Sequence, residues 1–205
     1  MAILTEDEID EILYFARANE IEDLKTYIPT LFPKYGTQPA WILSQAVDAE
    51  TGNTSLHYAG ANGHIDMVNY LLSLFPSSSA DRKPFINKQN NSGNTALHWS
   101  SLNGHMSVVK ALLAAGADAS ILNNSGHDAV YEAEMNDKQE VAEYLLKEAL
   151  GLEKAIGREG DGRSPDEEDE EVEGGEGEGD GDADKVADGM AEMDLKSSTP
   201  KGDMG

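Results

Sequence analysis

A stretch of 21 residues recurs, with changes, at three places in this chain, and this repetition constrains the fold more than any other feature. The copies are GNTSLHYAGANGHIDMVNYLL from Gly52, GNTALHWSSLNGHMSVVKALL from Gly93 and GHDAVYEAEMNDKQEVAEYLL from Gly126, offset by 41 and 33 residues. A single unit of this length cannot bury its apolar face alone, so neighbouring units have to stack on one another. The repetition therefore predicts a solenoid.

A weaker fourth copy precedes these three. When the repeats are aligned, residues at the same position of successive copies form a column. If Ile21 is aligned with Ile65, the apolar residues of the two segments share columns, and Asn19 falls in the column of Gly63. Thr5 and Glu8 have the spacing of a capping box at the start of its first helix. We expect this copy to be an N-terminal capping repeat. The four predicted repeats cover about residues 5–47, 48–88, 89–121 and 122–156.

Three motifs recur in fixed order, T-x-L-H, N-G-H and V-x-x-L-L, and they resemble the ankyrin-repeat family, whose period equals the second offset of 33 residues. The resemblance implies an all-α ankyrin-repeat solenoid of about four repeats, connected by hairpin loops. It also implies that His57 and His98 bond to the threonines before them, Thr54 and Thr95, and to neighbouring backbone. These histidines are therefore not expected to bind a metal.

Two connections are longer than the ankyrin period requires, and each contains an apolar cluster. The clusters are Trp41, Ile42 and Leu43 in the first connection, and Phe85 and Ile86 in the second. In ankyrin architecture such insertions lengthen the second helix or the loop after it, so we expect the aromatic residues to fold back onto the stack. The alternative is that the clusters are docking points for a partner.

The residues from 157 to 205 differ in composition from the rest of the chain. They include 18 acidic and 5 basic side chains and no aromatic one, so they carry −13 of the net charge of −24. Their few apolar side chains cannot offset the entropy lost on ordering, and we predict a disordered acidic tail after a folded domain of residues 1–156. Both parts are acidic, which disfavours direct binding to nucleic acid and favours a basic protein partner.

Several functional classes find no support in the sequence. It contains no cysteine, no nucleophile elbow, no P-loop and no dinucleotide fingerprint. No apolar run reaches the ~20 residues that a membrane span needs. We therefore predict a protein that is not an enzyme, takes no cofactor or metal, binds no membrane, is a monomer and is located in the cytoplasm and nucleus.

The ankyrin resemblance implies that hairpin tips and first helices line one concave groove. The partner-binding residues predicted for this groove are Tyr14, Asn53, Tyr58, Ala61, Asn62, Asn94, Trp99, Leu102, Asn103, His127, Glu132, Met135 and Asn136. Aromatic and Met side chains in such a groove are typical anchors of a protein interface. An aromatic residue in the column of Tyr58 and Trp99 could equally be half-buried between repeats.

Acidic side chains gather at both ends of the predicted stack, where they could clamp a basic ligand. They are Glu6, Asp7, Glu8, Asp10 and Glu11 at one end, and Glu132, Glu134 and Asp137 at the other.

The stretch from Ile86 to Val141 carries a closer resemblance. It contains G-H-D-A followed by an aromatic residue and E-A-E, and together with the acidic first helix and acidic tail it resembles the small fungal ankyrin-repeat chaperones of ribosomal protein S-three, over about residues 6–150. The resemblance implies a protein that binds this basic small-subunit protein when newly made and keeps it soluble. It would shield the RNA-binding surface until assembly into the pre-ribosome, and would meet import factors through its cargo. The alternatives are a regulatory scaffold or inhibitor of a signalling or transcription protein, and a histone chaperone.

Overall fold

The fold is described from a computed structural model for residues 3–76 and 79–155, with side chains up to residue 148. Within these residues the chain forms α-helices joined by loops and no β-strand, apart from one isolated bridge between Val47 and Thr54. The predicted acidic tail lies outside the described residues, and so does the predicted boundary at residues 156 and 157.

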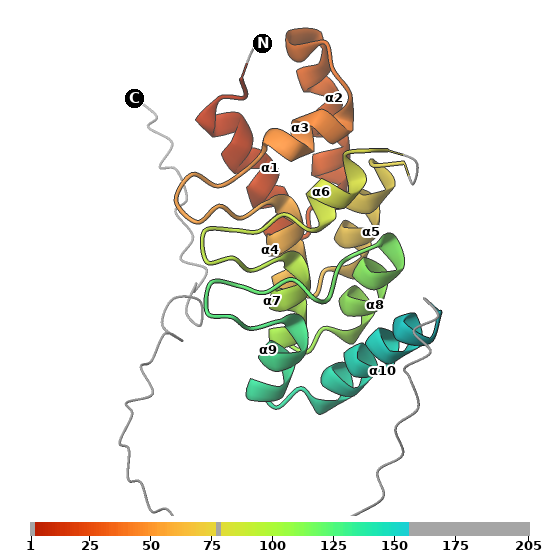
Figure 1. Cartoon of the computed structure of the whole chain (residues 1–205). Coiled ribbons are helices and arrows are strands. Elements are labelled where there is room, and N and C mark those ends of the chain that lie inside the picture. Colours follow the sequence, from red (N-terminus) through yellow and green to blue (C-terminus); the bar gives the residue numbers. More distant parts are fainter. Residues whose placement is uncertain (1–2, 77–78, 156–205) are drawn as a thin grey trace, which may run out of the picture. The chain divides into compact units, whose positions relative to one another are not determined.

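Eight of the helices form four successive pairs, stacked along one direction (Figure 1). The pairs are α1 (Glu6–Ala18) with α2 (Ile21–Tyr35), α4 (Ser55–Ala61) with α5 (Ile65–Ser73), α7 (Ala96–Leu102) with α8 (Met106–Ala115), and α9 (Ala129–Met135) with α10 (Gln139–Ala155). First helices contact first helices, in the order α1, α4, α7 and α9, and α2, α5, α8 and α10 do the same among themselves. The predicted all-α ankyrin-repeat solenoid is confirmed.

The first helix of each pair begins after a residue whose side chain caps it. Thr5 accepts a hydrogen bond from the backbone N–H of Glu8, and Glu8 accepts one from the backbone N–H of Thr5 at 2.8 Å, so the predicted capping box is present. Helices α4 and α7 begin in the same way, after Thr54 and Thr95, with a histidine in place of the glutamate.

Each of these histidines connects two repeats. The backbone N–H of Thr54 donates to Nδ1 of His57 at 3.1 Å, so the ring proton is on Nε2, which donates to the Asn94 carbonyl oxygen at 3.0 Å. His98 makes the corresponding bonds to Thr95 and to the carbonyl oxygen of His127. The predicted bonds of both histidines are confirmed.

The two long connections fold back onto the stack as additional short helices, α3 (Pro39–Gln45) and α6 (Arg82–Ile86). Ile42 and Leu43 are fully buried, and Trp41 is half-buried against the core. Phe85 is also buried and stacks on Phe75 with ring centroids 4.2 Å apart. The clusters therefore fold back onto the stack as expected, and only Trp41 keeps part of its apolar surface exposed.

Candidate protein-binding face

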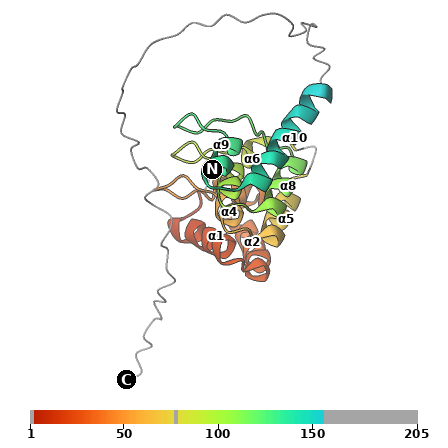
Figure 2. The same ribbon diagram turned by 90° about the horizontal axis from the view of Figure 1, so that it is seen from below.

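The three hairpin loops, which precede α4, α7 and α9, project to one side of the stack, and the second helices lie on the other side (Figures 1 and 2). We call the side formed by the hairpins and by α1, α4, α7 and α9 the front face. Equivalent residues of successive repeats follow one another along it, so a partner lying across the repeats would meet each column of side chains in turn.

Side chains bond the hairpins to one another. The amide Nδ2 of Asn90 donates to Oδ1 of Asn53, and Nδ2 of Asn123 donates to Oδ1 of Asn94, both at 2.9 Å. The same Nδ2 of Asn123 lies 2.8 Å from Oε1 of Glu132 on α9. These bonds fix the positions of the hairpins relative to each other and make the front face a preformed surface.

Two of the predicted groove residues are buried. Asn53 is 1% exposed and receives the bond from Asn90, and Tyr58 is 8% exposed and donates from its hydroxyl to Oδ2 of Asp48 at 2.6 Å. Asn53 thus joins the first hairpin to the second and Tyr58 ties the first hairpin to α4, so neither side chain is available for direct contact with a partner. The expectation that an aromatic in this column is buried between repeats fits Tyr58 best.

The other predicted groove residues reach the surface. Tyr14 and Met135 are 50% and 65% exposed. The exposed or partly exposed remainder consists of Ala61, Asn62, Asn94, Trp99, Leu102, Asn103, His127, Glu132 and Asn136. Their role in binding stays a prediction.

The exposed asparagines have one shared property. The amide Nδ2 of Asn62 donates to the Tyr58 carbonyl at 2.9 Å, that of Asn136 to the Glu132 carbonyl at 2.9 Å, and that of Asn103 to the Ala61 carbonyl at 2.8 Å. Each amide therefore uses one of its two N–H groups internally, and its Oδ1 stays available as an acceptor. These acceptors suit a partner that offers donors, such as lysine, arginine or unpaired backbone N–H groups.

The predicted acidic clamp is only partly available. Glu6, Asp7, Asp10 and Glu11 of α1 are exposed. Glu8 is not: burial raises the pKa of its carboxyl, but hydrogen bonds from Lys34, Tyr35 and the Thr5 backbone outweigh this and lower the pKa to about 2. Glu8 therefore stabilises the capping repeat and is already paired with the Lys34 ammonium at 2.7 Å.

At the other end of the stack, Glu132 is also used internally. Its Oε1 accepts from Asn123 and lies 3.2 Å from Nδ1 of His127, and its side chain is 14% exposed. Glu134 and Asp137 are exposed, so they provide the accessible negative charge here.

Comparison with known proteins identifies the family. A family profile described as "Ankyrin repeats (many copies)" matches residues 56–113. The chain is 44% identical over 147 residues to the ankyrin repeat-containing protein YAR1 of Saccharomyces cerevisiae, covering 70% of each chain. It is 35% identical over 154 residues to an ankyrin repeat-containing protein of Schizosaccharomyces pombe, covering 74% of this chain and 94% of the relative.

The chain belongs to the ankyrin-repeat family. Its fold also matches a solved structure, titled as the yeast ribosomal protein Rps3 in complex with its chaperone Yar1. The TM-score is 0.63 and the sequence identity 41%, over 71% of this chain and 95% of the matched chain.

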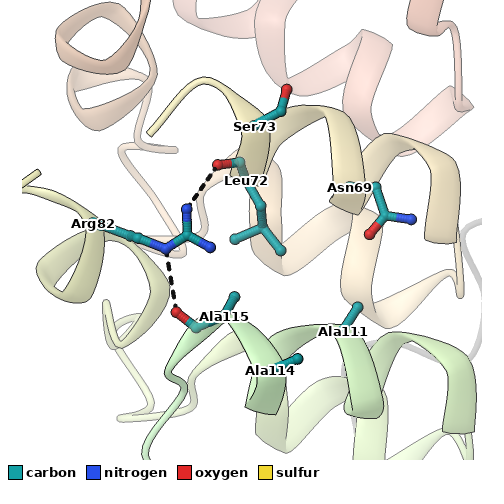
Figure 3. A pocket seen from close by; sticks show the side chains of 7 residues that line it. All are labelled: Asn69, Leu72, Ser73, Arg82, Ala111, Ala114 and Ala115. Carbon is teal, nitrogen blue, oxygen red and sulfur yellow. Dashed lines mark hydrogen bonds between the residues drawn. The ribbon is translucent and has the colours of Figure 1, made fainter. Parts of the chain in front are cut away.

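The back of the ankyrin stack has a hollow of about 310 Å³, where α5, α6 and α8 meet (Figure 3). It is lined by Asn69, Leu72, Ser73, Arg82, Ala111, Ala114 and Ala115. Its one ionisable side chain, Arg82, donates to the carbonyl oxygens of Leu72, Phe75 and Ala115 and ties α6 to both neighbouring helices. The hollow contains neither a nucleophile activated by a base nor an acid–base pair.

Residues 3–76 and 79–155 contain no group of three or more His, Asp or Glu side chains placed to hold a metal ion. None of the helices described is both long enough and apolar enough to cross a bilayer.

The sequence prediction missed Tyr131. Its ring is 41% exposed on α9 and lies 3.9 Å from the ring of His127, centroid to centroid. The sequence did contain a signal for it, because the last repeat lacks the T-x-L-H motif and has Tyr131 in the column of His57 and His98. A tyrosine where earlier repeats use a buried histidine indicates that the surroundings of this column change in the last repeat.

Proposed function

We propose that this protein is a chaperone of the small-subunit ribosomal protein that corresponds to yeast Rps3. The observation that carries the proposal is the match to the solved complex of Rps3 with its chaperone Yar1, at 41% identity over 71% of this chain. The match to YAR1 extends over 147 residues at 44% identity. This family of repeat proteins acts by binding and not by catalysis.

The chemistry of the front face supports a basic client. Its exposed asparagines present acceptors, and exposed carboxylates such as those of Asp10 and Glu11 lie on α1. A ribosomal protein outside the ribosome exposes cationic surface that has evolved for RNA. Covering that surface with a matching negative face prevents aggregation and nonspecific binding to polyanions.

The charge of residues 157–205 supports the same function. This segment adds −13 to a chain whose other residues already carry −11. Long-range attraction accelerates the encounter with a cationic client and weakens as salt increases. Ribosomal RNA, a denser polyanion, would displace the chaperone when the client is assembled.

The location of the protein follows from this function. The client is made in the cytoplasm and assembled in the nucleus, so we propose that the chaperone occurs in both compartments and that the client provides the contact with import factors. Fractionation of cells with and without depletion of the client tests this, because nuclear entry of the chaperone should be lost with the client.

Affinity purification of the full chain from its own cells tests the function. Mass spectrometry should identify the Rps3 counterpart as the main stoichiometric partner. A signalling kinase or transcription factor in its place would support a regulatory scaffold, and histones would support a histone chaperone. Either result would overturn the proposal.

A further inference from the structure

The last repeat exposes apolar side chains that a terminal repeat should not need. The outer face of the last repeat in a solenoid has no neighbour and is normally polar. Here Tyr131 and Met135 on α9 and Leu146 on α10 are 41%, 65% and 45% exposed. Column-by-column comparison with the earlier repeats separates the residues of the front face from those that point along the stack.

The column of Tyr131 points along the stack. His57 and His98, its counterparts, are each 2% exposed because the following hairpin covers them and accepts a bond from their Nε2. The column of Leu146 is covered less completely: its counterpart Leu72 is 6% exposed, and its counterpart Leu113 is partly buried against the core.

The glycines identify two further columns that face the next repeat. A Cβ on Gly60 would lie 3.2 Å from the Ala96 carbonyl oxygen in the next repeat, and Glu134 occupies this column in the last repeat. A Cβ on Gly63 would lie 2.6 Å from Nδ1 of His105, again in the next repeat. Asp137 takes the place of Gly63 and keeps its left-handed backbone, with φ of 57°.

The hairpins have a matching open edge. Each docks onto the one before through one asparagine: Asn91 donates from its backbone N to the Thr51 carbonyl at 2.9 Å and from its Nδ2 to the Glu50 carbonyl at 2.8 Å. In the next hairpin, Asn124 donates from its backbone N to the Ser92 carbonyl at 3.0 Å and from its Nδ2 to the Asn91 carbonyl at 2.9 Å.

The corresponding carbonyls of the last hairpin belong to Ser125 and Asn124. Neither accepts a hydrogen bond from the residues that the structure describes. A Cβ placed on Gly126 would meet no atom within 4 Å, whereas one on Gly93 would lie 2.6 Å from the backbone N of Asn124. The site that would receive another hairpin is thus preformed and has acceptors only.

The open end is therefore an apolar and acidic surface with two backbone acceptors. Its members are Asn124 and Ser125 through their carbonyls, and Tyr131, Glu134, Asp137 and Leu146 through their side chains. The nearby Lys138 packs toward the third repeat, since a Cβ on Gly104 would lie 2.8 Å from its Cδ. We propose that this open end is a second docking site, separate from the front face, for an arginine-containing extended segment of the client.

Arg82 shows within this chain how a guanidinium fits such a surface. It donates to the backbone carbonyls of Leu72 and Ala115, on two successive repeats (Figure 3), and also to that of Phe75. An arginine at the open end would meet the carbonyls of Asn124 and Ser125 in the same way, with Glu134 and Asp137 supplying the counter-charge. A second copy of this chain is disfavoured as the occupant because its net charge is −24.

This inference rests on the proposed client. Its test uses two full-length double variants at the open end, called the open-end pairs, each with a matched control. Tyr131→Ser with Leu146→Ser removes the apolar contacts, and Glu134→Gln with Asp137→Asn removes the charge while keeping a residue that tolerates positive φ. Ile3→Ser, at an exposed apolar residue before α1, and Asp23→Asn with Asp66→Asn, on α2 and α5, are the controls.

The measurement is affinity for the purified Rps3 counterpart, together with helicity and the urea midpoint. Each open-end pair should weaken binding by about tenfold or more, while the controls stay within about threefold and all variants remain folded. Unchanged affinity in both open-end pairs, with tight binding by the parent chain, overturns this inference and leaves the proposed function standing. Absence of binding by the parent chain removes both.

A photo-crosslinker at position 146 identifies what lies on the open end. The expected product joins it to an arginine-containing segment of the client. A product joined to a second copy, or to another segment of the same chain, would overturn the inference. The same crosslinker at position 62 reports on the front face. A client product from position 62 without one from position 146 would also overturn the inference.

Discussion

At the scale of single residues, the buried histidines show how the chain turns a titratable group into a structural one. Burial lowers the pKa of His57 from 6.5 to about 4, against the smaller opposing effect of its bond to Asn94. Burial also lowers the pKa of His98. Both rings are therefore neutral at pH 7, which is the form in which Nδ1 accepts from the helix start and Nε2 donates to the next hairpin.

The low pKa of His57 predicts a pH-dependent stability. As the pH falls below 6.5, the unfolded chain binds a proton that the folded chain does not bind until about pH 4. The stabilisation is thus complete above pH 6.5 and lost progressively down to pH 4, by at most about 1.4 kcal/mol per unit. Urea midpoints at pH 7.5 and 5 should show this loss, and His57→Gln should reduce it. A midpoint independent of pH in this window would contradict the burial of a neutral ring.

At the scale of elements, the hairpin is the unit through which repeats recognise one another. Gly93 and Gly126 occupy the same position in successive hairpins and have nearly the same φ, 78° and 80°. A Cβ at the first would collide with Asn124 of the next hairpin, whereas one at the second would meet open space. Substitutions at these two glycines therefore distinguish the free-energy cost of backbone strain, which both share, from the cost of disturbing hairpin stacking, which applies only at Gly93.

Gly93→Ala should therefore be more destabilising than Gly126→Ala. Both substitutions place alanine in the left-handed region, which costs roughly 1–2 kcal/mol. Only Gly93→Ala also displaces a neighbouring backbone, and we expect it to cost at least about 1 kcal/mol more. Urea denaturation of the two variants and the parent chain measures the difference. Equal losses would show that the hairpins do not stack as described.

At the scale of the whole molecule, the negative charge is divided between the repeats and the segment that follows them. Residues 157–205 carry −13 of the total of −24. Attraction of this kind depends on the number of charges more than on their order, and it weakens as the Debye length shortens.

Neutralising part of this segment should weaken client binding in a salt-dependent way. Changing the seven acidic residues within 166–173 to Asn and Gln keeps the chain length. Affinity at ~50 mM salt should fall by about tenfold, and the difference should disappear near ~500 mM. Reordering residues 166–173 without changing their composition is the control and should bind like the parent chain. An equal loss at both salt concentrations would contradict an electrostatic role.

The sequence alone determined the repeat architecture, since T-x-L-H and N-G-H mark the two middle helix pairs and the alignment of apolar positions places the first and last pairs beside them. It also determined the roles of Thr5 and Glu8, because capping depends on contacts three residues apart, whereas the roles of His57 and His98 were implied by the ankyrin resemblance. Only the tertiary structure decided which groove residues are accessible: Asn53 and Tyr58 proved buried through Asn90 and Asp48.

The open end was likewise decided by tertiary structure. A repeat pattern assigns Tyr131, Glu134 and Leu146 to columns, but the pattern is the same whether or not a neighbour covers the column. Exposure depends on which segments meet in space, and this is set by stacking between repeats. Local sequence therefore specified the helices and their caps, whereas the surface offered to a partner followed from where the stack of repeats ends.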